Sequence, residues 1–143
     1  MTIKFHKTMR NITKSALSLL ILILFCSIQS NAQVPDDNKV WESVEQDPQF
    51  PGGQEALLKW VSDNLRYPSV AKEEGIQGRV VVQFVVKIDG SIGTVKVVRG
   101  KDPDLDEEAI RVTKSLPKFA PGKMNGHPVN VWYTLPITFK LNQ

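Results

Sequence analysis

The feature that most constrains the fold is an alternating stretch near the C-terminus, HPVNVWYTLPITFKL, residues 127–141. Every odd-numbered residue from Val129 to Leu141 is apolar, and a period of two predicts a strand with one buried face. Pro136 lies within this run. Proline has no N–H to donate to a neighbouring strand, so it is confined to edge strands and bulges. We therefore expect either an edge strand, which can dock another chain, or a strand broken by a bulge at Pro136.

Residues 78–98 have the pattern of two strands joined by a turn. The turn is indicated by Asp89-Gly90, a typical hairpin dipeptide. The alternation places five residues on the buried face of the first strand: Val80, Val82, Phe84, Val86 and Ile88. The partner strand is expected over residues 92–98, with Val95 and Val97 facing inward.

Three helices are expected around these strands. Residues 54–65 and 69–74 place apolar residues at helical spacing. A third helix is indicated by KDPDLDEEAIRVTKSLP, in which Asp104 and Glu107 form a capping-box pattern. Short helices followed by β-β-α-β predict an α+β domain, in which an antiparallel three-stranded sheet has helices on one face.

The N-terminal residues indicate export. Residues 1–32 contain four basic residues and no acidic residue. They include the apolar run Ala16–Ile28 and end in Ser30-Asn31-Ala32, which together predict a secretory signal peptide cleaved before Gln33. A retained membrane anchor is the alternative, although the run is shorter than the roughly 20 residues of a membrane-spanning helix.

The positive charge of the chain lies in the same N-terminal segment. The formal net charge is +3, but outside residues 1–32 there are 14 basic and 15 acidic residues. This balance argues against a nucleic-acid partner. The single cysteine, Cys26, would leave with the signal peptide, so the exported domain is expected to be stabilised by its core without disulfides. The predicted organisation is a signal peptide over residues 1–32, a flexible polar lead over residues 33–49 and one domain over residues 50–143.

Few residues suggest catalysis or metal binding. His127 is the only histidine beyond the predicted signal peptide, and no second ligand stands near it at metal spacing. The acidic run Asp102–Glu108 lacks the glycine and ligand spacing of an EF-hand loop. No serine stands in a Gly-x-Ser-x-Gly setting. We therefore expect no catalytic residues, no metal and no cofactor, and this absence argues against the alternative of a periplasmic enzyme.

Trp132 points away from the buried face of the last strand. One interpretation is that it packs against the lead or against the short helices. The other is that it is an aromatic anchor beside an exposed strand edge, the kind of residue that dominates partner binding.

Taken together, several segments resemble the C-terminal domain of the TonB energy-transducer family, of the type found in Bacteroidetes. The resemblance covers residues 67–141, and FPGGQEALLKWVSDNLRYP resembles a segment found upstream in such proteins. The matching residues are Tyr67-Pro68 followed by Ala71, Gly75 and Gly78; Asp89-Gly90; Leu105-Asp106 with Ala109; and Phe119-x-Pro121-Gly122.

The resemblance implies a non-catalytic periplasmic domain that binds outer-membrane receptors. In such domains a receptor segment is added to the final strand, and main-chain hydrogen bonds supply affinity. The partner-binding residues implied are Asn64, Leu65, Arg66, Tyr67, Pro68, Asn130, Val131, Trp132, Tyr133, Thr134 and Leu135. Asn64-Leu65 occupy the place where a Gln-Pro pair is often found in the family.

Three arrangements remain open at this point. The first is an exported, soluble module that binds a receptor or another periplasmic protein. The second is a membrane-anchored energy transducer, which engages an inner-membrane motor only if the N-terminal segment is retained. Its lead would be short, because residues 33–49 reach roughly 60 Å when fully extended. The third is a homodimer formed through the last strand.

Overall fold

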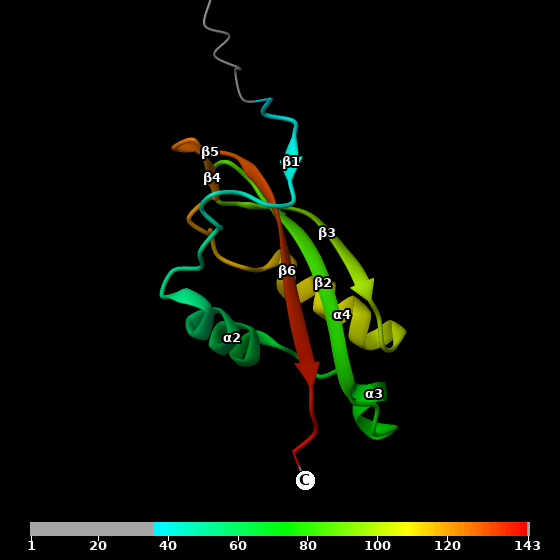
Figure 1. Ribbon diagram of the computed structural model, residues 1–143. Coiled ribbons are helices and arrows are strands. Elements are labelled where there is room, and N and C mark those ends of the chain that lie inside the picture. The colour runs from blue at the N-terminus through cyan, green and yellow to red at the C-terminus, as the bar shows by residue number, and fades with distance from the viewer. Residues whose placement is uncertain (1–35, 143) are drawn as a thin grey trace, which may run out of the picture. The chain divides into compact units, whose positions relative to one another are not determined.

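A four-stranded sheet in the order β1-β6-β2-β3 organises residues 36–142, the part of the chain that the computed structural model describes (Figure 1). Strand β2 pairs antiparallel with both β3 and β6, whereas β1 pairs parallel with β6. The strands are β1 (Val40–Trp41), β2 (Gly78–Val86), β3 (Ile92–Arg99) and β6 (Asn130–Phe139).

The helices lie on one face of this sheet, and α4 contacts both β2 and β3. The helices are α2 (Gly53–Asn64), α3 (Ser69–Glu73) and α4 (Pro103–Lys114). A separate small hairpin consists of β4 (Lys123–Met124) and β5 (His127–Pro128). The predicted α+β class, with three antiparallel strands and helices on one face, is confirmed. The two-residue strand β1 adds a parallel fourth strand that we did not expect.

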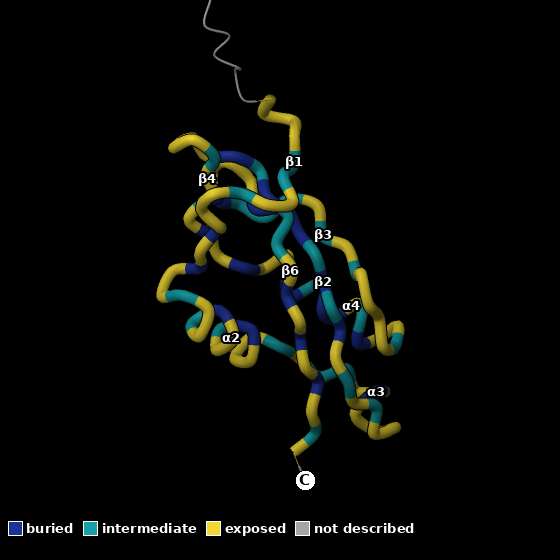
Figure 2. Tube along the Cα trace, in the orientation of Figure 1, coloured by how far each residue is buried: buried dark blue, intermediate teal, exposed yellow. Residues whose placement is uncertain are grey.

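The core lies between the sheet and the helices, where buried and exposed residues alternate along the strands (Figure 2). Alternate side chains of β2 and β6 are buried there: Val80, Val82, Phe84, Val86, Val131, Leu135, Ile137 and Phe139. The ring of Phe84 packs against Phe119 and Tyr133, with centroid distances of 5.7 and 5.3 Å. The period-two pattern therefore identified the buried face correctly.

Two local predictions were wrong. Ile88 was placed on the buried face, but β2 ends at Val86 and the Ile88 side chain is 40% exposed. The N-cap of α4 is Asp102, whose side chain accepts a hydrogen bond from the Asp104 N–H at 3.0 Å. The helix begins earlier than the capping-box pattern suggested because Pro103 occupies its first position, where a missing N–H costs nothing.

The lead that we expected to be flexible is attached to the domain at several points. Besides β1, residues Gln46 and Lys123 exchange two main-chain hydrogen bonds, of 3.1 and 2.9 Å. Gln49 and Ala120 exchange another two, of 3.0 and 2.8 Å. These pairings involve single residues or two-residue strands, which are too short to leave a periodic pattern in the sequence.

The predicted signal peptide or anchor, residues 1–32, lies outside the described residues. Among the helices of residues 36–142, none combines the length and the apolar character needed to cross a membrane.

Gly90 provides a test of how the β2–β3 loop packs. Its φ is +83°, and a Cβ there would overlap the carbonyl oxygen of Phe119, whose N–H donates to the Gly90 oxygen at 2.8 Å. Gly126 has a similar φ of +77° but open space around it. We expect Gly126→Ala to cost about 1–2 kcal/mol from backbone strain alone, and Gly90→Ala to cost about 1–3 kcal/mol more from overpacking. Urea unfolding of both variants measures the difference, and equal costs would contradict the close approach.

Candidate functional site

The candidate site lies along the outer edge of β6. One side of this strand pairs with β2 from Val131 to Phe139. On its other side, β1 pairs only with Asn130 and Val131. Within residues 36–142 no strand pairs with this side of β6 from Trp132 to Phe139. We call this stretch the free edge.

Pro136 fixes which main-chain groups face the free edge. The β2–β6 register runs through the pair Val81↔Pro136 without a break, so the bulge considered from the sequence is absent from this pairing. A proline nitrogen cannot donate a hydrogen bond, so in an unbroken strand it must face away from the neighbouring strand to which its own strand is hydrogen-bonded. Because the main chain alternates with a period of two, the groups of Trp132, Thr134 and Thr138 also face the free edge.

The opposite edge of the sheet, formed by β3, is less suited to pairing. Its register with β2 shifts at two places, between Val81 and Val82 and between Phe84 and Val86. It also carries the charged residues Lys96 and Arg99. Irregular pairing and charged side chains are the usual means by which proteins prevent an edge from accepting another strand. The free edge of β6 is regular and carries no charged side chain.

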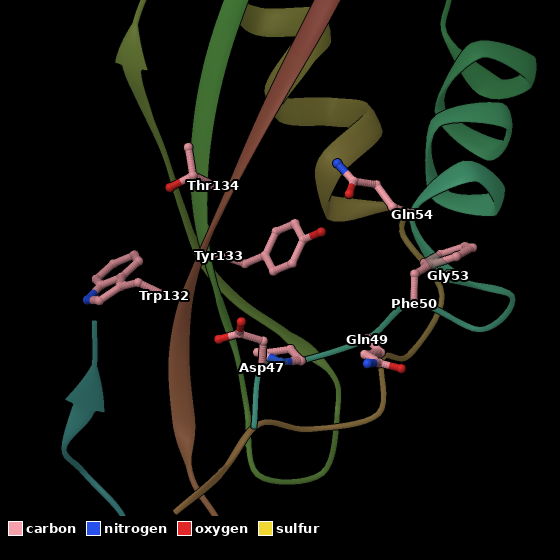
Figure 3. Close-up of a pocket in the computed structure, with 9 residues that line it drawn as sticks. Asp47, Gln49, Phe50, Gly53, Gln54, Trp132, Tyr133 and Thr134 are labelled. Atoms are coloured by element: carbon pink, nitrogen blue, oxygen red, sulfur yellow. The ribbon is translucent and has the colours of Figure 1, made fainter. Parts of the chain in front are cut away.

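A cleft of about 390 Å³ opens beside the free edge (Figure 3). One wall is formed by three consecutive residues of β6, and the other by the segment that leads into α2. The lining residues are Asp47, Pro48, Gln49, Phe50, Gly53, Gln54, Trp132, Tyr133 and Thr134. In Figure 3 the ring of Tyr133 points into the space between these walls, towards Gln54.

The second wall is held in place by both main-chain and aromatic contacts. The paired hydrogen bonds of Gln46 and Gln49 with residues 120–123 flank Asp47 on either side. The ring of Phe50 packs edge-on against Phe119 with a centroid distance of 5.4 Å. Phe119 also packs against Tyr133, with a centroid distance of 5.4 Å, so one ring connects a residue of each wall.

Asp47 sets the charge of the cleft. It is the only ionisable acid among the lining residues, and no lysine or arginine lines the cleft. Burial raises the pKa of the Tyr133 hydroxyl, and the negative charge of Asp47 raises it further. Tyr133 therefore stays protonated at neutral pH and can donate a hydrogen bond into the cleft.

Trp132 lies on the face of the sheet opposite the core, as the alternation predicted. The amino group of Lys96, on β3, lies 4.4 Å from the centroid of the Trp132 ring system. This cation–π contact reaches across β2 and covers part of the indole. In Figure 3 the indole points away from Tyr133, so the ring itself lies outside the space between the two walls of the cleft.

The upstream residues predicted to bind a partner are anchored to α4. The carboxylate of Glu108 accepts hydrogen bonds from the Arg66 main-chain N–H at 2.7 Å and from Arg111 at 2.6 and 2.7 Å. Arg111 also donates to the Asn64 carbonyl oxygen at 3.0 Å. Residues 64–66 therefore form a fixed connection between α2 and α3.

Tyr67 connects the upstream segment to the far end of β6. Its hydroxyl donates to the Ile76 carbonyl oxygen, and its ring packs edge-on against Phe139 with a centroid distance of 5.7 Å. Phe139 lies five residues beyond Thr134 along β6, about 17 Å in an extended strand. The predicted site residues thus fall into two groups, one beside each end of the free edge.

The second wall of the cleft was not predicted from the sequence. Residues 47–54 were assigned to a flexible lead, a turn and the start of a helix. The only signal was the Phe50-Pro51-Gly52-Gly53 turn, and it does not indicate against which part of the sheet the segment packs.

Within residues 36–142, no three histidine, cysteine or acidic side chains gather in a way that could hold a metal ion.

Comparisons with known proteins place this geometry in context. The family model described as Gram-negative bacterial TonB protein C-terminal matches residues 63–141. A TonB protein of Helicobacter pylori is 31% identical over an alignment of 115 residues, and the match covers 76% of this chain and 39% of that protein. A TonB protein of Haemophilus influenzae is 28% identical over an alignment of 123 residues, and the match covers 76% of this chain and 46% of that protein. The chain thus spans less than half the length of these relatives.

One solved structure resembles the domain described above. The solution NMR structure of a Helicobacter pylori TonB C-terminal domain is 29% identical in sequence. The match covers 62% of this chain and 94% of that one, with a TM-score of 0.49.

The Glu108 cluster predicts a pH-dependent contribution to stability. Burial raises the pKa of Glu108, but hydrogen bonds from Arg111 and Arg66 outweigh burial and hold the pKa below its ordinary value of 4.5. A carboxyl group with a lowered pKa stabilises the fold above its unfolded-state pKa and loses this effect as the pH falls through its folded-state pKa. We expect Glu108→Gln to cost about 1–3 kcal/mol at pH 7, and the cost to shrink below about pH 4.5.

Chemical denaturation at pH 7 and pH 3 measures this change. The control is Glu107→Gln, because Glu107 is the exposed neighbour on the same helix. A cost for Glu108→Gln that is the same at both pH values would show that the Glu108 charge does not hold residues 64–66.

Proposed function

The chain belongs to the family of Gram-negative bacterial TonB protein C-terminal domains, and we propose that its domain binds an extended segment of a partner protein by strand addition to the free edge of β6. The partner is an outer-membrane receptor, and the domain acts in the periplasm without catalysing a reaction. The observation that carries this proposal is the free edge of β6 from Trp132 to Phe139, which is regular and lies beside a cleft. The opposite edge of the sheet, formed by β3, is irregular.

The free edge supplies the groups that strand addition needs. Main-chain hydrogen bonds provide affinity in this mode of recognition, and pockets for alternate side chains provide selectivity. The N–H groups of Trp132, Thr134 and Thr138 face the edge, whereas Pro136 offers only its carbonyl oxygen. Leu135 and the other odd-numbered residues hold β6 in the core, so the strand does not need to refold when a partner pairs with it.

The two ends of the free edge are proposed to have different roles. At its start, β1 already pairs with Asn130 and Val131, so an added strand begins at Trp132. At its far end, residues 64–68 are the second contact region proposed from the family resemblance. Their fixed connection to α4 offers a surface that is ordered before the partner arrives, which lowers the entropic cost of binding.

Energy coupling is a separate and further part of the proposal. The relatives are TonB proteins, and this chain covers 39% of the Helicobacter pylori protein and 46% of the Haemophilus influenzae protein. We propose a role in TonB-dependent transport across the outer membrane, with the basic and apolar residues 1–32 directing export. Retention of these residues would allow coupling to an inner-membrane motor, and their cleavage would leave a binding module.

The second candidate is a homodimer in which the free edges of two copies pair with each other. The same regular edge supports it, because an unpaired edge strand can accept a second copy of itself. Size-exclusion chromatography at two concentrations distinguishes the two, since a dimer formed through the free edge would elute earlier at the higher concentration.

Substitutions at Thr134 test strand addition. Thr134→Pro removes one N–H from the free edge, whereas Thr134→Val keeps that N–H and changes only the exposed side chain. Loss of one main-chain hydrogen bond, worth about 1 kcal/mol, should weaken partner binding about fivefold. Thr134→Val should leave binding within about twofold.

Crosslinking in cells measures the effect. The full-length chain carries a photo-crosslinking phenylalanine analogue at Thr138, which is exposed on β6, and adducts are identified by mass spectrometry. We expect an outer-membrane receptor among the adducts and a lower yield with Thr134→Pro. Thermal unfolding confirms that both variants are folded, and an unchanged yield in a folded Thr134→Pro variant would exclude the free edge as the binding site.

A further inference from the structure

The cleft beside the free edge adds a requirement on the partner that main-chain pairing alone does not impose. Trp132 and Thr134 direct their main-chain groups to the free edge, and both residues line the cleft. Between them, Tyr133 directs its side chain to the core side of the sheet, into the cleft (Figure 3). Residues that face each other on neighbouring strands place their side chains on the same face. The residue of an added strand that lies opposite Tyr133 therefore directs its side chain into the cleft, whether the strand is parallel or antiparallel.

The walls of the cleft suit a long side chain with an apolar stem and a cationic end. Rings line it at Phe50 and Tyr133, and polar groups are provided by Asp47, Gln49 and Gln54. A volume of about 390 Å³ falls within the range of protein pockets that hold small ligands. Lysine and arginine bury their methylene stems against apolar surfaces while their charged ends reach polar groups.

The charges around the cleft favour a cation over an anion. Asp47 provides the one carboxylate among the lining residues, and its charge adds to the effect of burial in raising the pKa of the Tyr133 hydroxyl. The N-terminus of α2 lies at the opposite wall, where its dipole contributes a partial positive charge of about +0.5. Glu55, in the first turn of α2, offsets this partial charge. Since no lysine or arginine lines the cleft, the balance is negative.

We propose that the cleft selects partner segments that carry a lysine or arginine opposite Tyr133, with the cationic end of that side chain placed against Asp47. This inference rests on the proposed strand addition and adds to it the chemistry of one partner residue. Six of the nine residues that line the cleft, Asp47, Pro48, Gln49, Phe50, Gly53 and Gln54, precede the region matched by the family model, residues 63–141. The proposed selectivity therefore depends mainly on the segment upstream of that region.

Immobilised peptides test the selectivity with the full-length chain. The host is a decapeptide of alternating threonine and valine, and one central residue is replaced in turn by lysine, arginine, methionine or glutamate. The host can slide along the free edge until the replaced residue meets the cleft. We expect the lysine and arginine peptides to retain about fivefold more protein than the methionine peptide, as for one partly exposed ion pair. Outside residues 1–32 the chain has 14 basic and 15 acidic residues, so net charge alone gives the domain little non-specific attraction for a cationic peptide.

Two variants assign the effect to Asp47. Asp47→Asn should remove the preference for lysine and arginine while it leaves binding of the methionine peptide unchanged. Asp63→Asn is the matched control, because Asp63 is an exposed acid that pairs with Lys59 on α2 and does not line the cleft. The Asp63→Asn variant should still prefer the lysine and arginine peptides over the methionine peptide.

The outcomes separate this inference from the proposed function. If the peptides bind and Thr134→Pro weakens them, but lysine and arginine are not preferred or the preference survives Asp47→Asn, the cleft does not select a cation and strand addition stands. A preference for glutamate would show that the N-terminus of α2 dominates, and would also overturn the inference. If no peptide binds, or if Thr134→Pro has no effect on any of them, strand addition and the selectivity both fail.

Discussion

All nine residues of β2 pair with β6, from Gly78↔Phe139 to Val86↔Val131, without a register break. This pairing determines both faces of the domain at once, because a shift of one residue would turn every buried side chain of β6 to the outside. It also determines the edge. Once one side of β6 is bonded to β2 through Pro136, the remaining main-chain groups of every second residue must face away from the sheet. The core and the candidate binding surface are therefore two consequences of one register.

The sequence predicted those parts of the fold that depend on repeated patterns. Alternation along β2 and β6 identified the core face. Pro136 indicated a strand with an open side, which holds from Trp132 onward but not at Asn130 and Val131, where β1 pairs with β6. Residues 40–41 and 46–49 carry no comparable signal. Their contacts with Asn130, Val131, Ala120 and Lys123 depend on the finished surface of the domain. One wall of the cleft was consequently invisible in the sequence, although the strand that forms the other wall was predicted.

The two groups of predicted site residues differ in how the fold supports them. Residues 64–66 are held by the buried carboxylate of Glu108, which joins them to α4 through hydrogen bonds of 2.6–3.0 Å. Trp132 and Thr134 are held by the sheet and present unpaired main-chain groups. In the first group the side chains and main-chain groups are hydrogen-bonded to one another. In the second group the main chain is hydrogen-bonded to a neighbouring strand on one side only. Only the second can gain main-chain hydrogen bonds from a partner strand, which is why the proposed function is centred on β6.

The arrangement of β1 gives the domain an ordered response to mechanical tension. A pull at residue 36 first loads the Asp37 carbonyl oxygen, which accepts a hydrogen bond from the Asn130 side chain at 2.6 Å, and then Val40 and Trp41, which pair with β6. The bonds of Gln46 and Gln49 with the loop over residues 120–123 come next, and the β2–β6 ladder lies beyond both. Short pairings yield before a long ladder because fewer hydrogen bonds share the load. The N-terminal part of the domain can thus lengthen under force while the strand edge that would carry a partner keeps its shape.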